Sequence, residues 1–202
     1  MGNPATSAIN SPNTIDMRFR LTYRGKLGAN GNSKHKWALR AHFHRQLREL
    51  WTQEPLVNIT KYIDPLYQPD ECFLGVKRGE RWFYPIVSEK IWTIAELDIL
   101  LLRPGNPGSI SVGGGDIDNR LKTLLDSLQV PHENDRVENC PLPESESDVF
   151  CLLQNDKLIT RLAVEADRLL DGVSNRPDEV ALVIAVHVLA SSGRMCNLGI
   201  AV

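Results

Sequence analysis

Alternating apolar and polar residues predict three strands. Apolar side chains alternate with basic ones and Thr22 over residues 18–24, which predicts a half-buried strand with a basic outer face. A second strand is predicted over 91–102, with Asp98 as an exposed strand charge or, alternatively, as support for a metal site. Residues 179–190 are apolar on both faces, as in a buried strand, and His187 within them is interpreted as a satisfied core or interface histidine.

Helical periodicity appears twice. A helix is predicted from the N-cap Ser33 to about Trp51, with an apolar stripe formed by Leu39, Phe43, Leu47 and Leu50. A second amphipathic helix is predicted after Gly113-Gly114-Gly115, with its stripe formed by Leu121, Leu124, Leu125 and Leu128. With the strands, these helices indicate one domain of the α/β (α+β) class, with a small mixed sheet packed by two main helices.

The chain is divided into a flexible tail over residues 1–16 and one folded domain over 17–202. Residues 130–149 are polar and acidic, and we expect them to form an exposed insertion with little packed core. The run Trp82-Phe83-Tyr84 is expected to pack in the interior, with base stacking as the alternative.

Acidic residues concentrate where the second helix begins. Asp116 and Asp118 follow the glycines one residue apart, and Lys122 and Asp126 continue from Asp118 at intervals of four residues along one side of the helix. Two neighbouring carboxylates repel each other, and a divalent cation relieves that repulsion. Hard oxygen ligands favour Mg²⁺, with Mn²⁺ as an alternative. The competing interpretation is a helix cap at Asp116 or Asp118 followed by a solvated ion pair.

The segment Asp116-x-Asp118-Asn119-x-x-Lys122-x-x-x-Asp126-x-Leu128 resembles the signature of RusA-like Holliday junction resolvases. The resemblance extends over roughly residues 90–190. It implies a Mg²⁺-dependent endonuclease that acts as a homodimer on branched DNA, in particular on four-way junctions. It also implies that Asp116, Asp118 and a third acid hold the metal and that Lys122 is required for cleavage.

The third acid matches Asp156, which precedes an apolar strand, and Asp135 is the competing alignment. Asn155 stands where the family usually has the first acid of a pair. Two other functions therefore stay open: a non-catalytic DNA-binding module on the same fold, and a nuclease that acts on other branched DNA.

No Gly-Lys-Ser/Thr follows the glycine-rich loop, so a P-loop and a nucleotide cofactor are not expected.

Positive charge is concentrated in the first quarter of the chain. Residues 1–50 carry a net charge of +7 and residues 51–202 carry −9, although the whole chain carries only −2. Basic clusters bind phosphate backbones, although a solvated helix face would show the same pattern. The candidate contacts to nucleic acid are Arg24, Lys26, Lys34, Lys36 and Arg40.

The cysteines and the apolar runs bear on location. Cys72, Cys140, Cys151 and Cys196 show no metal-binding spacing and are interpreted as reduced thiols in a cytoplasmic protein. No stretch approaches the ~20 apolar residues that a membrane span needs, so no membrane association is expected.

Overall fold

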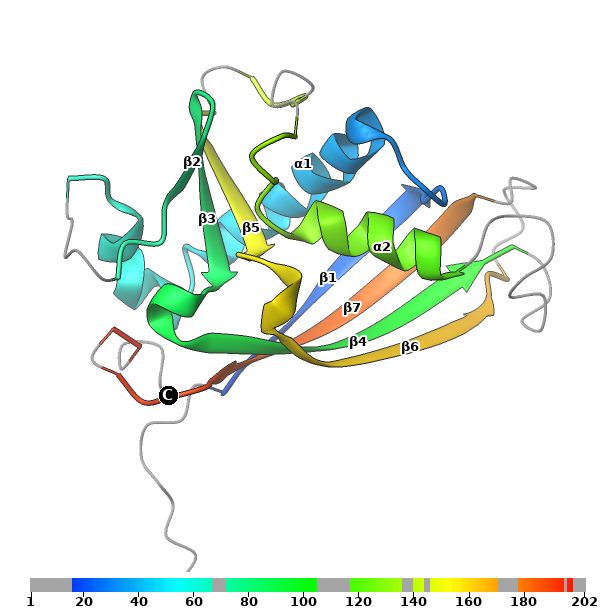
Figure 1. Cartoon of the computed structure of the whole chain (residues 1–202). Coiled ribbons are helices and arrows are strands. Elements are labelled where there is room, and N and C mark those ends of the chain that lie inside the picture. The colour runs from blue at the N-terminus through cyan, green and yellow to red at the C-terminus, as the bar shows by residue number, and fades with distance from the viewer. Residues whose placement is uncertain are drawn as a thin grey trace, which may run out of the picture.

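The computed structural model of the protein describes residues 16–66, 72–104, 117–135, 140–143, 146–170, 178–194 and 196–197. These residues form a single α+β domain, which confirms the predicted class (Figure 1). One small sheet was expected, whereas the structure has two mixed sheets, one of four strands and one of three. None of the described helices is long and apolar enough to cross a membrane.

The larger sheet has the order β1-β7-β4-β6. Its strands are β1 (Asp16–Lys26), β7 (Glu179–Ala190), β4 (Thr93–Arg103) and β6 (Ile159–Arg168). The apolar strand β7 lies inside the sheet, antiparallel to both β1 and β4. Strands β4 and β6 are parallel neighbours, and parallel neighbours require a crossover connection. Helix α2 (Ile117–Leu128) lies in that connection and returns the chain toward the start of β6.

Helix α1 (Ser33–Leu50) and α2 cover the same face of the four-stranded sheet (Figure 1). The N-cap of α1 is Asn32 rather than the expected Ser33, because the Asn32 side chain accepts a hydrogen bond from the His35 N–H at 2.9 Å. Both predicted apolar stripes reach the main core, through Leu39, Phe43 and Leu47 of α1 and Leu124 and Leu128 of α2. No described helix covers the other face of the sheet.

The smaller sheet consists of β2 (Val76–Arg78), β3 (Arg81–Val87) and β5 (Asp148–Leu153), with β3 in the middle. Phe83 and Tyr84 of β3 are buried, as expected for this aromatic run. A second, smaller core is formed by Trp37, Ala41, Phe83, Val130, Leu142, Val149 and Cys151. The remaining elements are the 3₁₀ helices η1 (Leu56–Ile63), η2 (Glu89–Ile91) and η4 (Asp156–Leu158).

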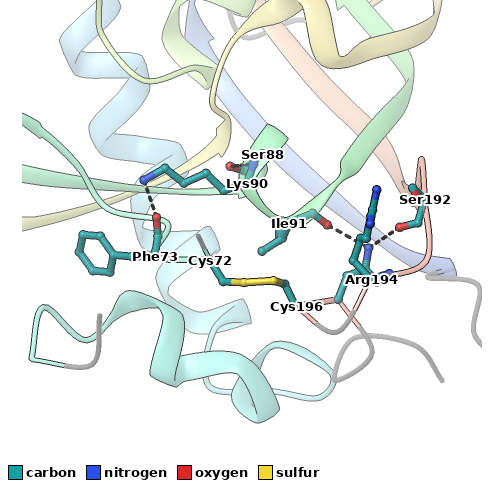
Figure 2. Close-up of a disulfide and its surroundings, with 9 residues drawn as sticks. Cys72, Phe73, Ser88, Lys90, Ile91, Ser192, Arg194 and Cys196 are labelled. Atoms are coloured by element: carbon teal, nitrogen blue, oxygen red, sulfur yellow. Dashed lines mark hydrogen bonds between the residues drawn. A yellow bond between two sulfur atoms is a disulfide. The ribbon is translucent and has the colours of Figure 1, made fainter. Parts of the chain in front are cut away.

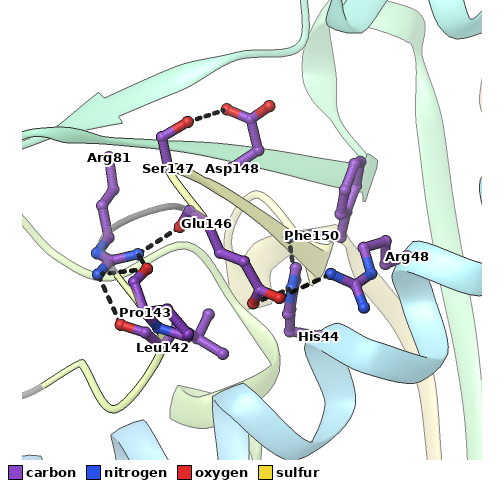
Figure 3. Close-up of polar contacts among 9 residues, drawn as sticks. All are labelled: His44, Arg48, Arg81, Leu142, Pro143, Glu146, Ser147, Asp148 and Phe150. Carbon is purple, nitrogen blue, oxygen red and sulfur yellow. Dashed lines mark hydrogen bonds and ion pairs between the residues drawn. The ribbon is translucent and has the colours of Figure 1, made fainter.

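The acidic insertion is packed more closely than its composition indicates. Val130 and Leu142 are buried in the second core. Figure 3 shows the Arg81 guanidinium donating hydrogen bonds to the backbone carbonyls of Leu142, Pro143 and Glu146. The Glu146 carboxylate in turn lies 3.0 Å from Arg48 Nη1 on α1. Half of the described residues of the insertion are exposed, as expected, whereas Val130, Leu142 and Val149 pack into the second core.

A disulfide joins Cys72 and Cys196, so the expectation of reduced thiols is wrong for these two residues. Figure 2 shows this bond linking the segment after β7 to the segment before β2. Asn197 adds hydrogen bonds from Nδ2 to the carbonyl oxygens of Ile91 (3.0 Å) and Ser192 (2.7 Å). The two cysteines are 124 positions apart in sequence, so no local spacing reveals the pair.

His44 of α1 is buried and protects the open edge of β5. Its Nδ1 accepts the Phe150 N–H at 2.9 Å, so the neutral ring carries its proton on Nε2. Nε2 faces Glu146 Oε2 at 3.7 Å (Figure 3). Burial, followed by the positive charge of Arg48, lowers the pKa of His44 to about 4, against the opposing effect of Glu146. The histidine is therefore neutral in the folded protein at pH 7.

We predict that the protein loses stability as the pH falls from about 6.5 to about 4. In that window the unfolded chain binds a proton at His44 that the folded protein does not bind, so protonation favours unfolding. The loss attributable to His44 approaches about 3 kcal/mol at pH 4.

The measurement is urea unfolding at pH 7.5, 5.5 and 4.0, for the wild type and for His44→Asn, whose Oδ1 can accept the Phe150 N–H but does not titrate. The wild type should lose more stability on acidification than the variant. Equal losses in the two proteins would show that His44 does not couple folding to pH.

Candidate functional site

The first turn of α2 presents the acidic residue that the sequence emphasises. Asp118 is exposed there, and its carboxylate is favoured by the positive end of the helix dipole. Lys122, one turn later, is also exposed. Asp116 lies outside the described residues. The structure therefore keeps Asp118 and Lys122 together on an open surface at the start of α2.

The rest of the predicted polar row serves a different purpose. Asp126, one turn beyond Lys122, is half-buried and forms a 2.6 Å ion pair with Lys36 of α1. The pair joins the two helices directly. Lys36, which was predicted to contact nucleic acid, therefore already has a protein partner, and only the first half of the row is available to a ligand.

The two possible third acids lie at the other end of α2. Asp156 belongs to η4, and its N–H donates to Oε1 of Gln129, which follows the last residue of α2. Asp135 accepts a hydrogen bond from the His132 N–H in the turn that leaves the helix. Since α2 has 12 residues, the length of the helix, about 15 Å or more, separates both acids from Asp118.

The topology explains this separation. The acidic loop follows β4, whereas Asp156 precedes β6, and these two strands are parallel neighbours. The end of one parallel strand and the start of the next lie at opposite ends of a sheet. The structure therefore does not bring Asp118 and Asp156 together within one chain.

A basic cavity of about 660 Å³ opens between the end of β1, the segment 27–32 and the starts of α1 and α2. Three of its lining residues carry positive charge, namely Lys26, Lys34 and Arg120. Among the described lining residues Asp178 is the one acid, and its carboxylate pairs with Lys26 Nζ at 2.8 Å. The described lining therefore has an excess of positive charge, as expected for a site that binds phosphate.

Two contacts hold the cavity wall against α2. The Gly31 N–H donates to Thr123 Oγ1 at 3.0 Å, and Arg120 donates from Nη1 to the Leu27 carbonyl. A Cβ at Gly31 would lie 2.5 Å from Thr123 Cγ2 and 2.7 Å from His35 Cδ2. Any larger residue at position 31 would push the wall away from the helix.

His35 contributes a neutral polar group to the cavity. Burial, followed by the positive charge of Lys26, lowers the pKa of His35 from its ordinary value. Its Nε2 accepts the Gly28 N–H at 3.3 Å, a role that requires an unprotonated ring nitrogen. The positive charge in the cavity therefore comes from the lysines and Arg120.

Arg120 is the cavity residue that sequence reasoning missed. It is 2% exposed, and it precedes Leu124 and Leu128 at intervals of four residues. That interval places the guanidinium on the buried side of α2, next to the apolar stripe. The helical spacing carried this signal, but the charge of Arg120 suggested an exposed residue.

Arg40 is not available to a nucleic acid in this structure, contrary to its predicted role. It is 3% exposed and stacks over the Trp37 ring, with Cζ 4.5 Å from the ring centroid. Its guanidinium donates to the carbonyls of Asp126 (2.6 Å) and Gln129 (3.2 Å) at the end of α2. Arg40 therefore pairs backbone oxygens that the helix leaves open. Arg24 and Lys34, by contrast, are exposed.

The donor set near α2 suits a hard divalent cation only in part. Among the described residues, no three His, Cys, Asp or Glu side chains gather to hold a metal ion. Asp118 offers one exposed carboxylate, and Asp116 stands two positions before it in sequence. Mg²⁺ is commonly held by one or two carboxylates, with water and substrate phosphate as its other ligands. These two acids fit that pattern without Asp156.

We predict that replacing two basic residues of α1 has different effects: one replacement lowers stability, and the other weakens DNA binding. Arg40→Met should lower the free energy of unfolding by about 2–4 kcal/mol, because it leaves buried carbonyl oxygens without donors. Lys34→Met, the matched control on the same helix, should change stability by no more than about 0.5 kcal/mol.

Lys34→Met should nevertheless weaken binding to a DNA oligonucleotide, measured by fluorescence anisotropy at fixed salt concentration. Chemical unfolding provides the stability values for both variants. Unchanged stability in Arg40→Met, together with a loss of DNA affinity equal to that of Lys34→Met, would contradict this assignment.

Comparisons with protein-family models, with curated proteins and with solved structures find no match to this chain. The functional interpretation therefore depends on the residues themselves and on the arrangement described above.

Proposed function

We propose that the protein is a Mg²⁺-dependent endonuclease that cleaves branched DNA, with the four-way junction as its substrate. The supporting observation is the exposed Asp118–Lys122 pair on the helix whose Arg120 lines the basic cavity. The RusA-like pattern of residues 116–128 supports the choice of reaction. Because no family model matches the chain, the family resemblance belongs to the proposal.

The cavity would bind the DNA backbone. Lys26 and Lys34 are exposed at its rim, whereas Arg120 is buried in its wall. Mobile lysines at a rim contact phosphate oxygens without reading the base sequence. The buried guanidinium of Arg120, which donates to the Leu27 carbonyl, adds positive charge to the wall behind them. Together they would hold the strand beside the acids of α2.

Asp116 and Asp118 would hold the divalent cation. When bound, Mg²⁺ or Mn²⁺ would lower the pKa of a water molecule and offset charge on the scissile phosphate. Lys122 lies one helical turn beyond Asp118 on the same side, where its ammonium group can approach a phosphate oxygen. Its positive charge would stabilise the charge that develops as the phosphodiester bond breaks.

Resolving a four-way junction requires two incisions, so the proposal includes a homodimer with one site in each copy. The proposal gives Asp156 no part in the site of its own chain, because α2 lies between Asp156 and Asp118. The cavity and the start of α2 would therefore act as one unit in each chain.

We predict that Asp118→Asn reduces cleavage of a labelled four-way junction at least about 100-fold, because it removes a metal-binding carboxylate. The matched control is Asp156→Asn at the opposite end of α2, which should retain cleavage within about tenfold. The assay compares the junction with a linear duplex and a flap, in Mg²⁺ and in EDTA. Paired Mg²⁺-dependent nicks confined to the junction are the expected result.

The second candidate is a non-catalytic DNA-binding module. It is favoured by the structural role of Asn155, which stands in place of an acid: its side chain accepts the Lys157 N–H at 3.0 Å as the N-cap of η4. Tight junction binding without cleavage in either Mg²⁺ or Mn²⁺ would establish this module and refute the nuclease. Equal cleavage of the flap and the junction would assign a broader branched-DNA nuclease.

A further inference from the structure

The described strands leave four sheet edges, at β1 and β6 in the larger sheet and at β2 and β5 in the smaller one. The free edge of a strand presents backbone N–H and C=O groups to another chain, and proteins usually shorten or cover such edges. Strand β2 has only three residues. The other three edge strands are longer, and two of them are covered.

Side chains of α1 cover the edges of β1 and β5. Gln46 acts like a neighbouring peptide for β1: its Oε1 accepts the Thr22 N–H at 3.0 Å, and its Nε2 donates to the Thr22 carbonyl at 2.8 Å. His42 Nε2 lies 2.9 Å from the same carbonyl oxygen. On β5, the Phe150 N–H donates to His44 Nδ1 at 2.9 Å. An added strand therefore finds both edges occupied at these positions.

Strand β6, at the other edge of the larger sheet, has no such cover (Figure 1). Just beyond its end, the Leu169 N–H donates to the Arg103 carbonyl of β4 at 2.8 Å. Successive residues of a strand point their backbone groups to alternate sides, so those of Leu162, Val164 and Ala166 point away from β4. Among the described residues, no side chain forms a hydrogen bond with these groups.

An apolar stripe runs along the free edge on the side that the helices cover. The side chains of Leu162, Val164 and Ala166 lie on that side, because the residues that pair with them in β4 are buried in the main core. Leu162 is 42% exposed. Leu121 and Leu125 of α2, which also pack against the main core, are only half-buried. An added strand would bury this apolar surface.

The opposite side of the same edge is acidic. Glu165 and Asp167 alternate with the apolar residues, so they point to the outer face of the sheet, where both are exposed. Neither forms an ion pair with another described side chain. Arg161 lies on the same face, but it is already paired with Asp98 of β4 at 2.8 Å. A strand that docks here therefore meets negative charge on its outer side.

We infer that the free edge of β6 is a docking site for an extended segment of a partner protein, which adds to the sheet beside β6. Backbone hydrogen bonds to Leu162, Val164 and Ala166 would hold the segment, as in other complexes formed by strand addition. Its residues would alternate in character. Apolar side chains would cover the apolar stripe, and lysine or arginine side chains would face Glu165 and Asp167.

A nucleic acid fits this edge poorly. The edge offers both N–H donors and C=O acceptors, whereas a phosphate backbone presents acceptors alone. Glu165 and Asp167 would also repel the phosphate groups. A polypeptide supplies donors and acceptors at the spacing of the strand, so it satisfies both kinds of group.

A second copy of the chain is a poorer occupant as well. Its β1 strand has the required alternation of basic and apolar residues, but Gln46 and His42 already fill the β1 edge. Its β6 strand would add more acidic side chains where basic ones are needed. Residues 1–15 and 105–115, which lie outside the described part of the chain, contain no lysine or arginine. The charge of the edge therefore favours a different protein.

Amide hydrogen exchange of the full chain, followed by NMR, tests whether the edge is free. The N–H groups of Leu162, Val164 and Ala166 should exchange at least about tenfold faster than those of Thr22 and Phe150, which side chains protect. Equal protection at all protein concentrations would show that the chain itself covers the edge. Protection that rises with concentration would assign the edge to a second copy. Either result would overturn the inference.

A synthetic peptide tests the occupant. Acetyl-Thr-Val-Lys-Val-Lys-Val-Thr-amide carries the proposed alternation, and its addition should shift the amide signals of Leu162, Val164 and Ala166 but not that of Thr22. The same peptide with glutamate in place of lysine should bind at least about tenfold more weakly, because like charges then lie across the strand pair.

N-methylated peptides test whether the two backbones pair. Antiparallel pairing is the more stable arrangement, and it directs the N–H groups of the valines toward β6 and those of the lysines away from it. N-methylation of the central valine should weaken binding at least about tenfold, whereas N-methylation of a lysine should leave it within about threefold. The reverse pattern would support a parallel strand. Equal affinities of the two methylated peptides would refute strand addition.

Ala166→Pro is the matching change in the protein. It removes an N–H that points away from β4, so the sheet should be kept while the affinity for the peptide falls at least about tenfold. Circular dichroism and thermal unfolding establish that the variant is folded, and the methylated peptides give the same test on the wild type. No binding of the lysine peptide at ~1 mM, or unchanged affinity in folded Ala166→Pro, would overturn the inference.

Discussion

Two buried guanidinium groups hold α2 in place, and the candidate site depends on that placement. Arg40 of α1 reaches the carbonyls at the end of the helix, and Arg120 near its start reaches the Leu27 carbonyl. Each donates hydrogen bonds to backbone carbonyl oxygens of another segment. With α2 fixed at both ends, Asp118 stays exposed at the surface while the segment 27–32 closes one wall of the cavity. The same arginines that stabilise the fold therefore fix the helix that carries Asp118.

Elements whose hydrophobic pattern is strongly periodic were predicted correctly from the sequence. The alternation in β1 and the leucine stripe of α2 each match the side that the structure buries, because burial of an apolar stripe dominates the placement of such an element. Periodicity did not predict which charged side chains turn inward. Arg40 and Lys34 have the same charge on the same helix, but only Arg40 has a set of carbonyl oxygens within reach. That distinction depends on the end of another helix.

Contacts between distant segments account for the other differences. The disulfide joins residues 72 and 196, and the second core joins α1 to β3 and β5. Neither leaves a local pattern in the sequence. The acidic segment appeared free of packing because the residue that organises it, Arg81, lies about 60 positions earlier in the chain. Composition describes the segment alone, whereas its structure is set by a residue outside it.

The position of Asp156 shows how a motif and a fold give different information. The order of residues in the sequence groups three acids, whereas the parallel pairing of β4 and β6 places the third at the far end of α2. A site built from Asp116, Asp118, Lys122 and the basic cavity is consistent with the topology.

The most direct measurement is to locate a bound metal ion by NMR, through the broadening of backbone amide signals by substoichiometric Mn²⁺. The account predicts that the signals of Asp118, Lys122 and their neighbours at the start of α2 broaden, while those of Asp156 and Lys157 stay sharp. Broadening centred on Asp156, or none in the first turn of α2, would contradict it.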